Sequence, residues 1–212
     1  MAQLRSLLLH RWAKPMLWLL CLLPLAWLVS RAAFGLLGAN PAEALIRATG
    51  DWALRSLCLV LALTPLRILT RTPALARFRR MLGLFVFFYA TLHALSYSGF
   101  DMGFDLGDIG RDIVKRPFIL VGFSAWVGLS LLALTSFNRA IQWLGARPWR
   151  TLHKLVYAIA ALALLHFFWM RAGKNNFAEV WVYTAVIVAL LGWRAWHALR
   201  SRAPMKRSLM TS

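Results

Sequence analysis

The sequence predicts an all-α, polytopic integral membrane protein: a bundle of about six transmembrane helices with both termini on the cytoplasmic side. Two observations lead to this fold class. Of the 212 residues, 60% are hydrophobic and 15% are charged, whereas a soluble domain has roughly 45–50% and about 25%. The hydrophobic residues also gather in six runs, each close to the ~20 residues that a spanning helix needs.

The formal net charge of +18 does not indicate a nucleic-acid-binding protein. Such a protein carries its basic residues on a water-exposed patch, and this chain has little polar surface for one. A disordered chain is excluded as well, because disorder requires low hydrophobicity. We therefore expect membrane lipid, and no nucleic acid, around this protein.

Taken in order, the expected spans are Pro15–Leu37, Trp52–Leu69, Met81–Ser98, Phe118–Phe137, Leu152–Met170 and Phe177–Trp196. Pro24 and Pro65 are expected to kink or shorten the first two, since proline lacks a helical donor. A cleaved signal peptide is the alternative for the first run, but three tryptophans and its length favour an uncleaved span. Residues 1–212 then form one membrane domain with short basic tails at both ends.

The charged residues predict the orientation. With the amino terminus inside, the inner segments hold 17 of the 25 lysines and arginines, and the outer segments hold the other 8. All seven acidic residues fall in the outer segments. Because short loops rich in lysine and arginine stay in the cytoplasm, both termini are predicted to lie inside.

Three of the five histidines, His93, His153 and His166, fall within the spans. An ionisable residue there marks a functional site or a hydrogen bond between helices. A helix rises ~1.5 Å per residue, so His93 lies ~18 Å from the cytoplasmic start of the third span and His166 ~21 Å from that of the fifth. The two spans run in the same direction. Two imidazoles at one depth on facing helices are what a bis-histidine haem iron needs, whereas zinc needs three or four ligands.

His153 lies 13 residues before His166, which places it ~20 Å away along the helix and on another face. A second haem at this inner level would need a partner ligand. Met81, His10 and His197 are the candidates, and the sequence does not choose among them. The sequence therefore predicts one haem site and leaves a second haem, or another inner-side role, open for His153.

Five short motifs, in this order and spacing, resemble one family. They are Arg79-Arg80-x-Leu82-Gly83-Leu84, Tyr89-x-x-Leu92-His93, Lys115-Arg116-Pro117-Phe118-Ile119, Trp149-x-x-Leu152-His153-Lys154-x-x-Tyr157 and His166-Phe167. The chain resembles, over about residues 10–200, the haem-binding membrane subunits of bacterial protein-methionine-sulfoxide reductase systems (MsrQ or YedZ). That family belongs to the ferric-reductase-like transmembrane group.

The resemblance implies an inner-membrane subunit with a b-type haem and a bound flavin mononucleotide (FMN). It implies electron transfer from the quinone pool to a periplasmic molybdopterin-containing subunit, which reduces methionine sulfoxide in oxidised proteins. The substrate chemistry would then lie on the partner chain, making this chain an electron-transfer subunit of an oxidoreductase complex. His93, His153 and His166 match the family's three intramembrane histidines. Relatives with two haems place two histidines on each of two helices, whereas the third span here has one.

Two other functions remain as alternatives. A small transporter with a histidine relay would need acidic residues within its spans, and none of the seven lies in the middle of an expected span. A scaffold without a cofactor would use the histidines only to join helices.

Two charged segments carry further expectations. The loop from Gly99 to Pro117 contains four aspartates at a helix-face spacing, but its four glycines argue against a stable isolated helix. It is either a docking surface for the partner or a hydrated interfacial loop. The basic segments Arg71–Arg80 and Arg200–Arg207 are expected to contact anionic lipid headgroups, or to hold a flavin phosphate or guide a quinone headgroup.

Overall fold

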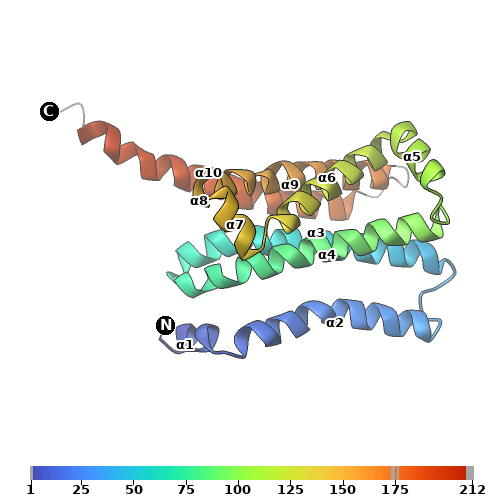
Figure 1. Ribbon diagram of the computed structural model, residues 1–212, viewed down its shortest axis with the longest axis horizontal. Helices are drawn as coiled ribbons and strands as arrows, with labels where there is room; N and C mark the ends of the chain where they lie inside the picture. Colours follow the sequence, from blue (N-terminus) through green and yellow to red (C-terminus); the bar gives the residue numbers. More distant parts are fainter. Residues whose placement is uncertain (1, 173–174, 176, 209–212) are drawn as a thin grey trace.

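The structure, a computed structural model, describes residues 2–172, 175 and 177–208, with side chains described for 5–172, 175 and 177–200. These residues form helices and no strand (Figure 1). Six helical segments of the described chain are long and apolar enough to cross a membrane. The predicted all-α bundle of about six spanning helices is therefore confirmed. Lys174 lies outside the described residues, and so do the side chains of the carboxyl-terminal basic segment beyond Arg200.

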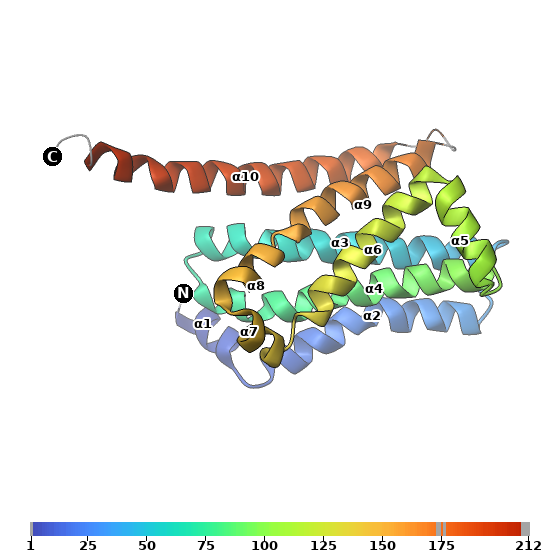
Figure 2. The ribbon, with the colours of Figure 1, turned by 45° about the horizontal axis from the view of Figure 1, so that its top comes forward.

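The helices of the described chain are α1 (Ala2–Leu9), α2 (Ala13–Ala33), α3 (Pro41–Leu69), the 3-10 helix η1 (Pro73–Phe78), α4 (Arg79–Phe100), α5 (Leu106–Lys115), α6 (Pro117–Leu134), α7 (Asn138–Leu144), α8 (Ala146–Leu152), α9 (Leu155–Ala172) and α10 (Ala178–Ser208). Helix α4 continues η1 to make the third span, and α9 continues α8 to make the fifth. Helix α3 packs against α4 and α6 packs against α9, while α10 lies along α3 and α9 (Figure 2).

Helix α3 begins eleven residues earlier than the predicted span, which placed its start at Trp52. The Asn40 side chain caps it by accepting a hydrogen bond from the Glu43 backbone N–H at 3.1 Å. Glu43 also pairs with Arg47 at 2.6 Å, one turn along the helix. These polar residues therefore stabilise a helix start rather than forming a loop. At 29 residues, α3 is ~43 Å long, so its first turns extend beyond the ~30 Å hydrocarbon layer.

The two prolines in the first two spans do not shorten them. Pro24 lies inside α2 and Pro65 inside α3, and both helices continue past them. Membrane helices tolerate proline because neighbouring groups satisfy the freed backbone carbonyl. Helix α2 ends instead at Ala33, before a turn in which Gly35 has a φ of +67°.

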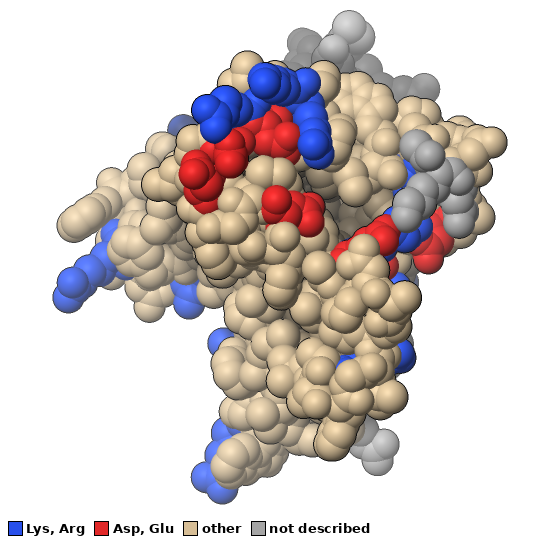
Figure 3. All heavy atoms as spheres, turned by 90° about the vertical axis from the view of Figure 1, so that its right-hand side faces the viewer, with Lys and Arg blue, Asp and Glu red and all other residues tan. Residues whose placement is uncertain are grey.

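The bundle has two ends of opposite character. The basic end holds α1, the turn between α3 and η1, and helices α7 and α8; the last turns of α10 lie toward the same side (Figure 1). At the acidic end, α3 and α10 begin, and α5 connects α4 to α6. All seven acidic residues belong to the half of the bundle nearest this end (Figure 3). This separation matches the charge count that predicted the orientation.

The aspartate-rich segment forms helix α5, as the helix-face spacing of its aspartates favours, although its glycines argued against a stable isolated helix. The Asp105 carboxylate caps the helix by accepting a hydrogen bond from the Asp108 backbone N–H at 2.9 Å. Asp112 accepts a hydrogen bond from the Tyr97 hydroxyl at 2.5 Å and pairs with Arg116 at 2.9 Å. Asp108 pairs with Arg111. The cap and the tertiary contacts offset the low helix propensity of glycine.

Candidate functional site

The fold brings His93 and His166 together. His93 comes from α4 and His166 from α9, and the centroids of their rings lie 6.1 Å apart with an interplanar angle of 75°. The helices that carry them run in the same direction, as the sequence predicted. Their side chains meet in the half of the bundle nearest the acidic end.

Each imidazole is held by a backbone carbonyl of the helix beside its own, α3 for His93 and α6 for His166. The His93 Nδ1 lies 2.8 Å from the Ile46 carbonyl oxygen in α3, and the His166 Nδ1 lies 2.7 Å from the Phe118 carbonyl oxygen in α6. Because a carbonyl oxygen only accepts hydrogen bonds, Nδ1 carries the proton in both rings. The Nε2 atoms therefore keep their lone pairs, which is the tautomer that binds a metal ion.

A glycine lies beside each imidazole. A Cβ atom added to Gly50 would come within 3.0 Å of the His93 Nδ1, and one added to Gly122 within 2.7 Å of the His166 Nδ1. Each glycine follows the hydrogen-bonding carbonyl residue by four positions, so both lie on the face that meets the histidine. Sequence analysis missed these glycines, although a glycine inside a span often marks a close approach.

The surroundings of His93 in the α3–α4 pair and of His166 in the α6–α9 pair are built in the same way. The carbonyl residue and its histidine are 47 positions apart in the α3–α4 pair and 48 apart in the α6–α9 pair. In both pairs a glycine of the first helix makes room for an imidazole of the second. Two similar helix pairs therefore present one histidine each to the centre of the bundle. No internal repeat is visible in the sequence.

The histidine pair fits the axial ligation of a haem iron. A metal–imidazole bond is about 2 Å long, so two imidazoles on opposite sides of one iron have ring centroids about 6 Å apart, as His93 and His166 do. Within the described residues no group of three or more histidine, cysteine or acidic side chains gathers to hold a metal ion. A site with two protein ligands suits an iron whose other ligands come from a porphyrin.

His153 lies apart from this pair, at the end of α8. Its Nδ1 lies 3.1 Å from the Trp149 carbonyl oxygen, and its Nε2 lies 3.4 Å from the Ser136 hydroxyl. It lines a cavity of about 470 Å³ at the basic end. None of the three partner ligands considered from the sequence (His10, His197 and Met81) lines that cavity. The geometry within the described chain thus gives His153 no second axial ligand.

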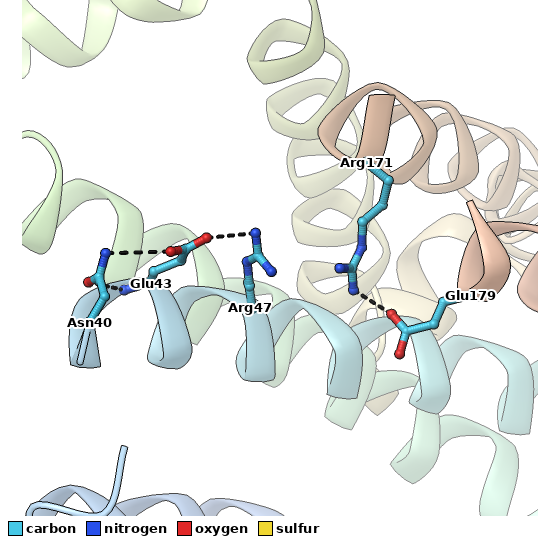
Figure 4. A network of polar contacts seen from close by, with 5 residues as sticks. All are labelled: Asn40, Glu43, Arg47, Arg171 and Glu179. Atoms are coloured by element: carbon cyan, nitrogen blue, oxygen red, sulfur yellow. Dashed lines mark hydrogen bonds and ion pairs between the residues drawn. The ribbon is translucent and has the colours of Figure 1, made fainter. Parts of the chain in front are cut away.

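Two ion pairs lie near the acidic end, one between α9 and α10 and one within α3 (Figure 4). Arg171 of α9 pairs with Glu179 of α10, and Arg47 of α3 pairs with Glu43. Arg171 follows His166 by five residues, and Arg47 follows the carbonyl residue that holds His93. The first pair therefore ties α9, which carries His166, to α10, and the second lies within α3 beside the carbonyl residue that holds His93.

Comparison with known proteins identifies the family. The ferric reductase like transmembrane component family matches residues 49–164, which include His93 and His153 and end two residues before His166. A protein-methionine-sulfoxide reductase haem-binding subunit, MsrQ, of Polaromonas naphthalenivorans is 68% identical over 93% of this chain and 90% of its own length. The chain belongs to the MsrQ family. No solved structure matches it.

Other MsrQ proteins are similar over nearly as much of the chain. The MsrQ of Ralstonia nicotianae is 50% identical over 86% of this chain and 84% of its own length. The MsrQ of Caulobacter vibrioides is 44% identical over 88% of both chains. The resemblance found from five short motifs is therefore confirmed, and the chain is a multi-pass membrane protein of the MsrQ family.

Proposed function

We propose that this chain is the haem-binding electron-transfer subunit of a protein-methionine-sulfoxide reductase system, with a b-type haem held by His93 and His166. The observation that carries the proposal is the meeting of two imidazoles whose centroids lie 6.1 Å apart. Each is fixed through Nδ1 and keeps Nε2 for a metal. The similar proteins are named haem-binding subunits, which supports the same cofactor here.

A bound haem would supply a carrier that takes and gives one electron at a time. The residues of this chain orient the two imidazoles through the Ile46 and Phe118 carbonyl oxygens and keep them half-buried among four helices. We propose that electrons come from the quinone pool and that the flavin mononucleotide implied by the resemblance takes part. They pass to a periplasmic molybdopterin-containing partner, where a sulfoxide takes up two electrons and two protons and releases water.

We also propose that the basic end faces the cytoplasm and that the protein lies in the bacterial inner membrane. The excess of arginine and lysine at that end supports this orientation. The histidine pair then lies in the periplasmic half of the bilayer, near the acidic end. A periplasmic partner would dock at this end, where α5 and the start of α3 project from the bundle.

The two alternative functions gain no observation of their own. Asp51 of α3 follows Gly50, which lies beside His93, so one acidic residue is near the depth of the histidine pair. A proton relay along the spans would need more acidic residues than this one. A cofactor-free scaffold would explain the Nδ1 hydrogen bonds between helices. It would not explain why two separate helix pairs each leave a glycine-lined space for an imidazole at the same place.

An optical spectrum of the purified chain tests the proposal. In mild detergent, the protein should show a Soret band, and sharp α and β bands should appear on reduction with dithionite. Addition of a quinol in place of dithionite should produce the same reduced bands, because the proposed donor is the quinone pool. A colourless but folded preparation would support the scaffold alternative and refute the haem proposal.

A further inference from the structure

A groove lies between α3 and α10 and shares no lining residue with the cavity at the basic end. Its volume of about 410 Å³ falls within the range of about 300–1,000 Å³ that is usual for small-molecule sites. Leu59 of α3 and Val186 of α10 line it and are exposed at the surface of the bundle. In a membrane this surface meets lipid, so the α3–α10 groove is open to molecules dissolved in the bilayer.

The lining of the α3–α10 groove changes from polar to apolar along its length. Both helices begin at the acidic end and run side by side in the same direction (Figure 2). From the acidic end inward, the lining passes through Arg55, Leu59 and Ala62 on α3 and through Tyr183, Val186 and Leu190 on α10. Steps of three or four positions keep these residues on one face of each helix. The groove therefore suits a molecule with a polar head toward the acidic end and an apolar tail.

The polar end of the groove offers both donors and an acceptor of hydrogen bonds. The Arg55 Nε donates to the Tyr183 hydroxyl at 3.1 Å, and the guanidinium lies 4.8 Å from the centroid of the Trp52 ring. The terminal nitrogens of Arg55 form no hydrogen bond or ion pair within the described residues. Asp51 precedes Arg55 by one turn, and its carboxylate is likewise unpaired in that part of the chain.

The charges at this end favour an uncharged head over a phosphate. Asp51 lies within electrostatic reach of Arg55, so a phosphate bound to Arg55 would also be repelled by this carboxylate. Arg55 is the central residue of the 29-residue α3, which puts it inside the hydrocarbon layer rather than at the level of lipid phosphates. A neutral ring with hydroxyl groups can both donate to Asp51 and accept from Arg55.

The polar end of the groove also lies beside the histidine pair. The Tyr183 and Phe167 rings contact each other, with centroids 5.8 Å apart, and Phe167 directly follows His166. On α3, Arg55 follows Gly50 by five positions, and Gly50 lies against the His93 imidazole. A ring bound to Arg55 and Tyr183 is therefore separated from the proposed haem by about one layer of side chains.

We propose that the α3–α10 groove is the site where a membrane quinol binds and gives its electrons to the haem. This inference rests on the proposed function, in which the quinone pool is the donor. Arg55 and Tyr183 bind an oxygen of the quinol ring, Asp51 accepts a hydrogen bond from a hydroxyl, and the tail lies along the apolar part of the groove. Oxidation to the quinone breaks two O–H bonds. Two electrons pass one at a time to the haem iron, and two protons pass by way of Asp51 to water at the acidic end.

The test measures how fast a quinol reduces the haem. The haem-loaded full chain in detergent is mixed with decylubiquinol, a quinol with a shortened tail, and the rise of the reduced α band is followed. At low quinol concentration, Arg55→Gln should slow the reduction about tenfold to a hundredfold, because it removes a charged hydrogen-bond donor. Tyr183→Phe keeps the ring beside Phe167 and should slow it about threefold to tenfold. Dithionite should reduce the haem fully in both variants, since it needs no quinol site.

Ala62→Phe tests the groove without changing its polar end. The added ring would occupy the apolar part of the groove, so the quinol concentration that gives half the maximal rate should rise about tenfold, while the maximal rate stays the same. Val188→Phe and Arg111→Gln are the matched controls, because both residues are exposed and lie outside the groove. Both controls should behave as the wild type. Unchanged kinetics in Arg55→Gln and in Ala62→Phe would overturn the proposal.

Photolabelling locates the site and separates quinol from phospholipid. A quinone that carries an azide group is activated by light in phosphatidylcholine vesicles containing the protein, and the labelled peptides are identified by mass spectrometry. The label should fall within residues 55–62 and 182–190, and labelling confined to other segments would overturn the proposal. If phosphatidylglycerol displaces the label as readily as unlabelled quinol does, the groove holds phospholipid and the quinol assignment is wrong.

The failure of this proposal is distinguishable from a failure of the proposed function. Normal reduction of the wild-type haem by quinol, with unchanged rates in the groove variants, would refute the site alone. A haem that dithionite reduces and quinol does not would refute the quinone pool as the donor, and the site with it. A missing Soret band would refute the haem itself.

Discussion

Replacing either His93 or His166 with alanine is expected to remove the b-type haem from the purified chain. Each variant leaves one imidazole facing a site that needs two. The haem content should fall more than about tenfold, since loss of even a residue that only orients a ligand typically weakens binding 10–100-fold. The measurement is the ratio of haem, determined as the pyridine haemochrome, to protein.

His153→Ala and His10→Ala are the matched controls for this result. His153 lines the basic-end cavity and His10 is exposed, so neither variant should lose the haem. If His93→Ala retains a full complement of haem with unchanged bands, His93 is not an axial ligand. If His153→Ala loses haem while His166→Ala does not, the haem is held at the basic end instead.

Gly122→Ala is expected to reduce haem binding although it replaces no ligand. The new Cβ would lie 2.7 Å from the His166 Nδ1, which is closer than such atoms approach. The imidazole must then move away and give up its hydrogen bond to the Phe118 carbonyl oxygen. Because this bond orients the ligand, we expect haem retention about 10–100-fold weaker, measured by haem content after dilution.

The control for this prediction is Gly192→Ala in α10. A Cβ there meets no atom within 4 Å, so this variant should keep its haem and gain roughly 0.5–1 kcal/mol of stability, as glycine-to-alanine changes in helices usually do. Gly50→Ala, with its nearest contact at 3.0 Å, should have a smaller effect than Gly122→Ala. Identical haem content in all three variants would show that the glycines do not form part of the site.

The histidine pair is predictable from the sequence because depth in a membrane follows from position along a helix. The constant helical rise placed His93 and His166 at one level before any contact was known. Their hydrogen bonds to Ile46 and Phe118 were not predictable. They depend on which helices pack side by side, and the hydropathy of each run does not determine this packing.

The early beginning of α3 was not predicted, and for the α5 segment the glycines argued only against an isolated helix. Polar residues and glycines indicate loops when each is judged by its own propensity. Here Asn40 and Asp105 act as caps, and Asp112 is held by Tyr97 of a neighbouring helix. Caps and tertiary contacts override a weak local preference.

The basic-end cavity was missed because Arg194 was counted only as a positive charge on the cytoplasmic side. Its position inside the last predicted span indicated a role between helices, but the count of positive charges on each side of the membrane did not consider depth. The structure places its guanidinium between helices, on the Leu61 carbonyl oxygen and the Thr64 hydroxyl. The same charge can therefore serve topology and line a cavity, and only the packing of α10 against α3 distinguishes the two roles.

The central claim is that His93 and His166 bind opposite sides of one iron. Electron paramagnetic resonance of the oxidised wild-type protein, with haem per chain determined on the same sample, tests it most directly. We predict one haem per chain and a low-spin ferric signal of bis-histidine type, which is lost in His166→Ala. A high-spin signal from a five-coordinate iron, or a low-spin signal that persists in His166→Ala, would contradict the claim.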